Sequence, residues 1–207
     1  MDLNWAVSLY KKLKMKRNMR KVAPYVDLSK ETHYEDNFFV DIIKPVPRND
    51  KFLSIGKHGM IGGSFIFETS TGKITVGDRC HIGGGQFISR KSISIGNDVT
   101  IAWDVTLYDH NSHSIYWDER RNDTEQEYKD FLETGDECRN KDWSVVKSAP
   151  IVIKDKAWLG FGVTVLKGVT IGEGAVIGAK SVVTHDIPSW TVAAGNPASV
   201  VKRIEHE

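Results

Sequence analysis

Residues 153–184 read IKDKAWLGFGVTVLKGVTIGEGAVIGAKSVVT, and a large apolar residue occupies every sixth position of this stretch. The same step runs through three earlier stretches. Together, the positions are Ile55, Ile61, Phe67, Val76, Ile82, Ile88, Ile95, Ile101, Leu107, Ile153, Leu159, Val165, Ile171, Ile177 and Val183. A period of six fits neither a helix nor an amphipathic strand, and the strands of a sandwich recur at about 8–12 residues. The sequence therefore predicts a solenoid of short repeated units.

Each six-residue unit is expected to form one short strand and one corner, so that three units complete a triangular turn. The apolar residue would point into the prism, where burying a large aliphatic side chain contributes about 1.5–3 kcal/mol. Glycine often follows it, and we expect these glycines to take backbone angles that a Cβ forbids. They are Gly56, Gly62, Gly77, Gly83, Gly96, Gly160, Gly172 and Gly178. The triplets give about five coils, at residues 55–72, 76–93, 95–112, 153–170 and 171–188.

This pattern resembles the hexapeptide-repeat acyltransferases, and the resemblance runs from about residue 52 to residue 204. Members of that family fold as left-handed parallel β-helices, an exception to the usual handedness of parallel connections. The resemblance implies an all-β solenoid of this kind, with residues 51–204 as the acyltransferase domain. Residues 1–50 would then be an N-terminal helical or irregular cap.

The N-terminal segment has helical features. Across residues 1–22, apolar side chains fall at helical spacing: Leu3, Val7, Tyr10 and Leu13. The segment is basic, with no acid between residues 3 and 26. One interpretation is a contact with an anionic membrane surface. The favoured interpretation is a helix that caps the terminal coil, because solenoids need capped ends.

Residues 113–150 interrupt the repeat with an insertion rich in charged and aromatic residues. Loops of this length are usually functional or disordered. The aromatic residues argue against plain disorder: Tyr116, Trp117, Tyr128, Phe131 and Trp143. We predict an ordered arm that packs over a neighbouring surface.

The composition excludes several classes of protein. The chain has 207 residues, of which 40% are hydrophobic and 27% charged, as in soluble globular proteins. The net charge of +1 gives no reason to expect a nucleic-acid partner. No apolar run is long enough to span a membrane, and the N-terminal charges stand in the wrong order for a secretory signal. Cys80 and Cys138 form no close-spaced metal motif and fit a reducing environment, so a cytoplasmic location is predicted.

The chemistry is expected where the repeat gives way to the arm, in DHNSHSIYWDERR at residues 109–121. Histidine suits a general base because its unperturbed pKa is about 6.5. In related sugar and polysaccharide-modifying acetyltransferases, the last histidine before the loop is followed by an acid or polar residue and an arginine. The resemblance thus implies that His113 is the catalytic base and that His110 supports it. Asp109 and Asn111 would fix a histidine tautomer, contact the acceptor or cap the chain as it leaves the coil.

The last coils resemble the cofactor side of the same enzymes. The motifs are WLGFG at 158–162, IGAKSVVTHDIP at 177–188 and VAAGNPASVVKRI at 192–204. The resemblance implies that acetyl-CoA is the co-substrate, that transfer is direct and that no metal is needed. The residues it assigns to the cofactor are Trp158, Gly160, Ala179, Thr184, His185, Lys202 and Arg203. Of these, Lys202 and Arg203 would meet the phosphates.

On the acceptor side, Gln86 stands at a repeat position where small residues are usual. The resemblance favours acetylation of a sugar or polysaccharide-precursor hydroxyl, by a homotrimer whose sites lie between adjacent subunits. The residues alone leave alternatives open. These are transfer to the amine of an amino-sugar or xenobiotic, a non-catalytic scaffold, and a zinc enzyme like the γ-class carbonic anhydrases. In the zinc enzyme, the metal ligands would be His81, His110 and His113.

Overall fold

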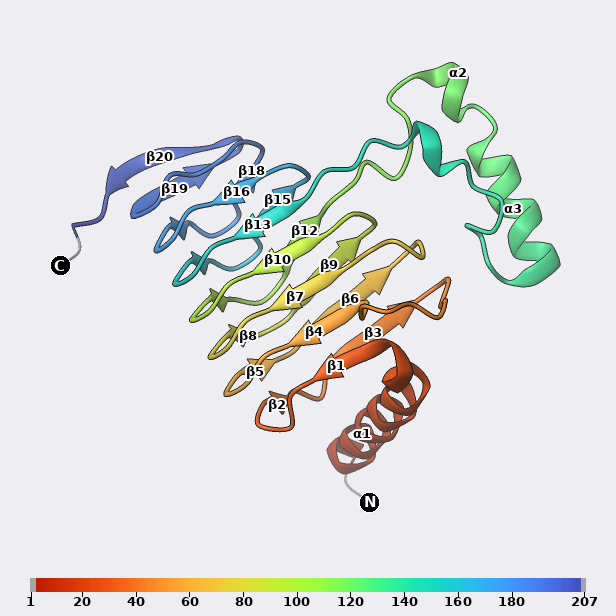
Figure 1. Cartoon of the computed structure of the whole chain (residues 1–207), viewed down its shortest axis with the longest axis horizontal. Coiled ribbons are helices and arrows are strands. Elements are labelled where there is room, and N and C mark those ends of the chain that lie inside the picture. The colour runs from red at the N-terminus through yellow and green to blue at the C-terminus, as the bar shows by residue number, and fades with distance from the viewer. Residues whose placement is uncertain (1–2, 206–207) are drawn as a thin grey trace.

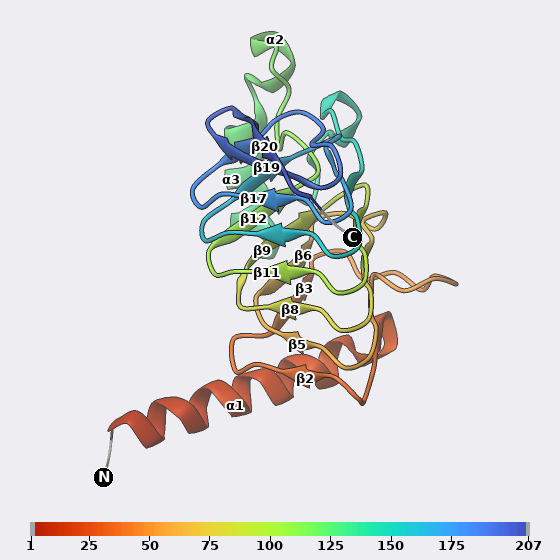
Figure 2. The same ribbon diagram turned by 90° about the vertical axis from the view of Figure 1, so that its left-hand side faces the viewer.

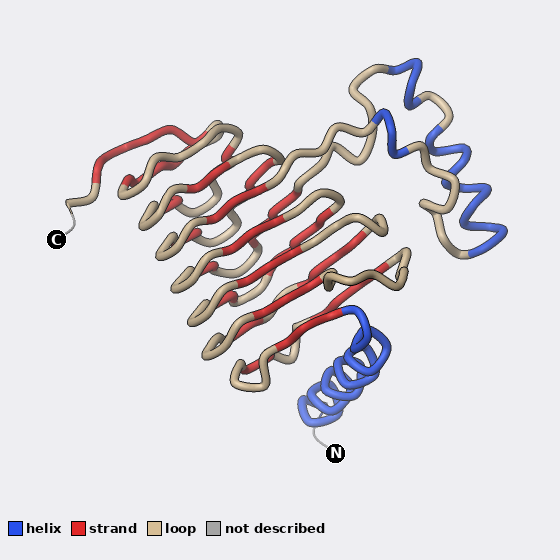
Figure 3. The backbone as a smooth tube through the Cα atoms, viewed as in Figure 1, coloured by secondary structure: helices blue, strands red, loops and turns tan. Residues whose placement is uncertain are grey.

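The fold is a prism with three sides, each a sheet of parallel strands. The computed structural model describes residues 3–205, with side chains described for residue 10 and residues 13–205. The strand order is β1-β4-β7-β10-β13-β16 in the first sheet and β3-β6-β9-β12-β15-β18 in the third. The second sheet has the order β2-β5-β8-β11-β14-β17-β19-β20, and its last pair is antiparallel. Figure 3 shows the strands of successive coils stacked on one another between the corners.

The strands are short, and their bounds follow the repeat. The first sheet contains β1 (Val26–Leu28), β4 (Leu53–Ile55), β7 (Ile74–Val76), β10 (Ile93–Ile95), β13 (Ile151–Ile153) and β16 (Thr170–Ile171). The second contains β2 (His33–Tyr34), β5 (Met60–Ile61), β8 (His81–Ile82), β11 (Thr100–Ile101), β14 (Trp158–Leu159), β17 (Val176–Ile177), β19 (Thr191–Gly195) and β20 (Ala198–Arg203). The third contains β3 (Phe39–Ile42), β6 (Ser64–Phe67), β9 (Gly85–Ser89), β12 (Val105–Tyr108), β15 (Thr164–Leu166) and β18 (Val182–Val183). We call the turn between the first and second sheets the first corner. The second corner joins the second and third sheets, and the third corner returns the chain to the first sheet.

The predicted parallel solenoid is confirmed, and the apolar residues of the repeat fill its interior. All the repeat positions are buried except Ile88, which is half-buried. In β9 the inward places belong to Phe87 and Ser89, so the sequence register was wrong there by one residue. Phe87 stacks on Phe65 of the coil below, with ring centroids 4.8 Å apart. The inner column is thus continuous through the shift.

The prism begins earlier than the sequence indicated. Residues 26–42 were assigned to the cap, but they form β1, β2 and β3, which pair with β4, β5 and β6. Leu28 and Tyr34 pair with Ile55 and Ile61, so the step of six is present here too. The next repeat position, Phe67, pairs with Ile42, which lies eight residues after Tyr34, and no glycine marks the step. The second corner of this coil therefore carries two extra residues, and it bulges.

The repeated glycines are needed for a different reason than expected. None of the predicted glycines has a φ in the left-handed region. A Cβ on Gly77 would lie 2.6 Å from the carbonyl oxygen of Gly96 in the next coil, so glycine permits the close approach of the backbones. Left-handed φ values occur two residues further on, at His58, Arg79 and Asp98.

The predicted N-terminal helix is present as α1 (Leu3–Val22), followed by the short 3-10 helix η1 (Ala23–Tyr25). It lies beside β3 at the first coil, and its N-terminal half extends past the prism (Figure 2). Asn18 bonds the backbone of Val40 in both directions, at 2.8 and 3.0 Å. Packing on the core comes from Met15, Met19 and Val22, whereas Tyr10 and Leu13 are exposed. The side chains of Leu3 and Val7 lie outside the described residues.

The insertion is an ordered arm, as predicted, and it stands out from one edge of the prism (Figure 1). It contains α2 (Trp117–Arg120), α3 (Asp123–Thr134) and the 3-10 helix η2 (Trp143–Val145). The ladders continue past it, because β10 pairs with β13 and β12 pairs with β15. Among the helices of the described chain, none is both long and apolar enough to cross a membrane.

Candidate active site at the base of the arm

The arm leaves the prism at the third corner, after β12, and both candidate histidines lie there. The side chain of His110 is fully buried. Its Nε2 lies 2.9 Å from Oε2 of Glu68, although the two atoms are not aligned for a hydrogen bond. Its Nδ1 accepts the backbone N–H of Ser112 at 3.2 Å, and its ring meets Tyr108 and Trp143 edge to face. A substrate therefore has no open path to either nitrogen.

His113 has the opposite surroundings. Its side chain is 40% exposed, and its Nδ1 lies 2.6 Å from Oδ2 of Asp123, the first residue of α3. A carboxylate only accepts, so the N–H of the neutral imidazole lies on Nδ1. The Nε2 lone pair is then free for a proton. A histidine held by a carboxylate at one ring nitrogen, with the other nitrogen free, has the same arrangement as the base of a Ser-His-Asp triad and can accept a proton.

Asp109 precedes the histidines but serves the coil. It is fully buried, and its carboxylate accepts 2.8 Å hydrogen bonds from the backbone of Arg90 and Lys91 and from the hydroxyl of Ser89. Burial raises the pKa of its carboxyl, and the hydrogen bonds oppose that shift. Its side chain is thus used at the neighbouring third corner and does not face an acceptor. Asn111 is half-buried, and its backbone N–H donates to Lys147 at 3.0 Å.

Two residues that sequence reasoning missed hold the arm in shape. The guanidinium of Arg90 donates to the carbonyl of Trp143 at 2.6 Å and to the hydroxyl of Ser148 at 2.9 Å. Within the arm, the buried carboxylate of Asp130 accepts two 2.7 Å hydrogen bonds from Asn140. Like Asp123 and Glu68, these residues have no repeat or spacing signal, because their partners lie far away in the sequence or on the folded arm.

The residues assigned to the cofactor fall on two edges of the prism. Trp158, on β14, is 53% exposed; Gly160 and Ala179 follow at the second corner, and Ala179 is exposed. A Cβ on Gly160 would lie 2.8 Å from the backbone nitrogen of Ala179, so these two coils touch there. Thr184 and His185 follow β18 at the third corner, with Oγ1 and Nδ1 2.8 Å apart.

The remaining candidates are spread over the surface. Lys202 and Arg203 lie exposed on β20, the last strand of the second sheet. Gln86 is exposed on β9, between Ser64 and Thr106 on the outer face of the third sheet. One chain therefore does not bring His113 together with the second-corner residues, which occupy a different edge.

The histidines of the zinc alternative are also separated. His81 faces outwards on β8 in the second sheet, whereas His110 is buried at the third corner. Within residues 3–205, no group of three His, Cys, Asp or Glu side chains is arranged to hold a metal ion. Cys80 is buried and bonds the carbonyl of Gly96 at 3.1 Å, as expected for a core residue.

Family models match the repeat on both sides of the arm. Residues 53–90 and 73–108 match the hexapeptide repeat of succinyl-transferase, and residues 150–185 match the bacterial transferase hexapeptide model. WbbJ of Escherichia coli (strain K12), named as an O-acetyl transferase of lipopolysaccharide biosynthesis, is 34% identical over 162 residues, or 77% of this chain and 76% of WbbJ. The chain belongs to the hexapeptide-repeat transferases. Over 58 residues, which are 28% of either chain, this chain is also 60% identical to a protein of Schizosaccharomyces pombe that is named as an acetyltransferase.

Solved structures agree on the fold. The polySia-specific acetyltransferase NeuO superposes with a TM-score of 0.54 and 27% identity, over 88% of this chain and 82% of NeuO. AntD, an N-acyltransferase from Bacillus cereus in complex with dTDP and 3-hydroxybutyryl-CoA, has a TM-score of 0.59 and 17% identity, over 92% and 88% of the two chains. The likeness to AntD is one of fold. The chain is an acetyltransferase, as its curated relatives are named.

Proposed function

We propose that the enzyme transfers the acetyl group of acetyl-CoA to a hydroxyl of a sugar or polysaccharide precursor, with His113 as the general base. The observation that carries the proposal is the exposed His113 ring held at Nδ1 by Asp123. Nε2 takes the acceptor's proton while the acceptor oxygen attacks the thioester carbonyl. The intermediate collapses with cleavage of the C–S bond, and the proton on Nε2 passes to the CoA thiolate. The products are the acetyl ester and free CoA.

The supporting residues follow from this assignment. His110 would pack behind the site, on its buried side, and position the start of the arm. Trp158, Gly160, Ala179 and Thr184 would line the pantetheine channel, with His185 beside them. Lys202 and Arg203 would meet the phosphates. Asn111 and Gln86 would face the acceptor, whereas the buried Asp109 would hold the corner behind them.

We also propose that the enzyme works as a homotrimer. The base and the second-corner cofactor residues lie on different edges, so the third corner of one copy and the second corner of its neighbour would complete one site. The arm offers a surface for this contact. Tyr128, Phe131 and Leu132 lie on one face of α3, and each is more than half exposed. An apolar helix face of this kind is typical of a surface that a partner covers.

The test is an acetyl-transfer assay with a panel of nucleotide sugars and oligosaccharides. Release of CoA would be followed with a thiol reagent, and the product identified by mass spectrometry and NMR. A sugar ester is the expected product. An amide on an amino-sugar would replace O-transfer by N-transfer. CoA release that depends on no acceptor in the panel would contradict the sugar assignment.

A further inference from the structure

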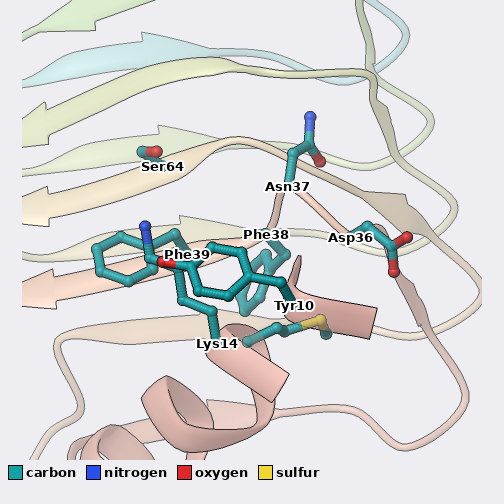
Figure 4. A pocket seen from close by; sticks show the side chains of 8 residues that line it. Tyr10, Lys14, Asp36, Asn37, Phe38, Phe39 and Ser64 are labelled. Carbon is teal, nitrogen blue, oxygen red and sulfur yellow. The ribbon is translucent and has the colours of Figure 1, made fainter. Parts of the chain in front are cut away.

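A surface hollow, which we call the groove, lies at the second corner of the first coils, on the N-terminal side of the proposed cofactor residues. It has a volume of about 270 Å³ and is lined by Glu35, Asp36, Asn37, His81, Gly83 and Trp103. A larger hollow of about 480 Å³ adjoins it and shares Asp36 and Asn37 as walls. Figure 4 shows that second hollow, where α1 brings Tyr10 and Lys14 opposite Phe39 and Asn37. The bulged corner of the first coil, with its two extra residues, forms the wall between the hollows.

The side chains of the smaller hollow fit closely onto glycine backbone. The amide of Asn37 donates to the carbonyl of Gly83 at 3.2 Å, and a Cβ on Gly62 would lie 2.3 Å from Asn37 Oδ1. A Cβ on Gly83 would lie 3.1 Å from Cε2 and Nε1 of the Trp103 indole. The indole thus rests on a glycine on one side. It is still 63% exposed, so its other side is available to a ligand.

The groove lies on the same edge as the cofactor side. Trp103 follows β11, and the next coil up carries Gly160 at the corresponding corner. The two coils are joined there, because Gly162 donates its N–H to the carbonyl of Trp103 at 2.9 Å. A molecule in the groove would therefore lie directly below a cofactor bound at Gly160 and Ala179, on the side away from the C-terminal coils.

The chemistry of the smaller hollow suits a carbohydrate without charge. An exposed indole offers an apolar face to the C–H face of a sugar ring. Around it stand an amide, an imidazole and two carboxylates, which hydrogen-bond hydroxyl groups. The carboxylates of Glu35 and Asp36 would repel the carboxylate of an acidic sugar, and this repulsion between like charges would weaken its binding. The ion pair that Glu35 makes with His33 is long, at 3.8 Å, and both groups are exposed.

We propose that this groove is the sugar-binding part of the acceptor site, that Trp103 stacks on the sugar ring, and that Glu35 and Asp36 select an uncharged sugar over an acidic one. This inference rests on the proposed function, because it places the acceptor of that reaction. It adds the class of sugar and the residues that select it.

The first test measures binding without catalysis. Uncharged mono- and disaccharides, each paired with its uronic or sialic acid counterpart, would be titrated into the full-length enzyme by calorimetry. Uncharged sugars should bind more tightly. Trp103→Ala should weaken their binding about tenfold, which corresponds to the loss of roughly 50 Å² of apolar contact. Trp117→Ala, on the arm and 65% exposed, is the matched control and should bind as the wild type does.

The second test measures selectivity. Asp36→Asn with Glu35→Gln should lower the preference for uncharged over acidic sugars several-fold, while the KM for acetyl-CoA stays unchanged. Gly83→Val should mimic Trp103→Ala, since the added side chain displaces the indole. The inference is overturned if Trp103→Ala binds and turns over acceptors like the wild type, if the wild type binds none of the uncharged sugars, or if it prefers acidic ones. If the enzyme acetylates an acceptor and Trp103→Ala does so equally well, the proposed transferase activity is retained and only the assignment of the sugar site to this groove is wrong.

Discussion

Replacing His113 by alanine should reduce turnover far more than it alters any binding step. The ring is 40% exposed and bonds Asp123 at the surface, so its removal leaves no buried cavity. General bases contribute about 10²–10⁴ in rate. At about 1.4 kcal/mol per tenfold change, the expected increase in activation free energy is roughly 3–5 kcal/mol. The dissociation constant of acetyl-CoA and the melting temperature should stay close to those of the wild type.

Asp123→Asn separates orientation from proton transfer. The asparagine amide can donate to Nδ1, which would place the imidazole proton on Nε2 and block the base. We expect a lower kcat with an unchanged KM for acetyl-CoA. His58→Ala is the matched control, because His58 also faces a carboxylate, Glu31 at 3.0 Å, but at the first corner.

The assay is steady-state CoA release together with calorimetry for acetyl-CoA. The reasoning would be refuted if His113→Ala kept more than about a tenth of the wild-type kcat. A second refutation would come from His110. If His110→Ala keeps its melting temperature and loses turnover while His113→Ala does not, then the buried histidine is the base.

Three other predictions concern the cofactor, the assembly and the coils. Lys202→Ala with Arg203→Ala should raise the KM for acetyl-CoA but not for the acceptor, and added salt should mimic this, since exposed charges are screened beyond about 8–10 Å. Light scattering should give the mass of a trimer, and Phe131→Ser with Leu132→Ser should lower it. Gly77→Ala should cost about 1–3 kcal/mol by overpacking, seen in calorimetry as a melting temperature lower by about 2–12 °C; an unchanged value would show that the coils can separate.

The periodicity of the sequence predicts the prism because the repeat is local. One apolar residue at every sixth position places a strand, and the stacking of coils then follows. The same logic explains the failure at residues 26–42. Leu28 and Tyr34 keep the step of six, but Ile42, which pairs with Phe67, comes eight residues after Tyr34, and no glycine marks the turn. The repeated glycines are needed because the backbones of neighbouring coils lie close together there, and not because their φ is unusual. This close approach is visible only once the neighbouring coil is in place.

The residues of the candidate site also differ in whether the sequence alone could reveal them. His113 could be found because it stands where a regular pattern ends. Asp123 could not, because it reaches the histidine only after the arm has folded and brought the start of α3 back to the corner. Asp109 shows the reverse case. Its place beside two histidines left a chemical role and a capping role both open, and the hydrogen bonds from the backbone of Arg90 and Lys91 show that its carboxylate stabilises the coil.

The position of the arm explains how such a site can vary without disturbing the prism. The ladders on either side of the insertion are continuous, since β10 pairs with β13 and β12 with β15. The arm is therefore attached to the coils mainly through one corner, where Arg90 and Asp109 act. Substitutions on α3 should then alter the orientation of the base or the contact with a neighbour while the melting temperature changes little. The proposed sugar groove lies on another edge and depends on the bulged first coil. The base and the acceptor specificity are thus encoded in separate irregularities of one regular scaffold.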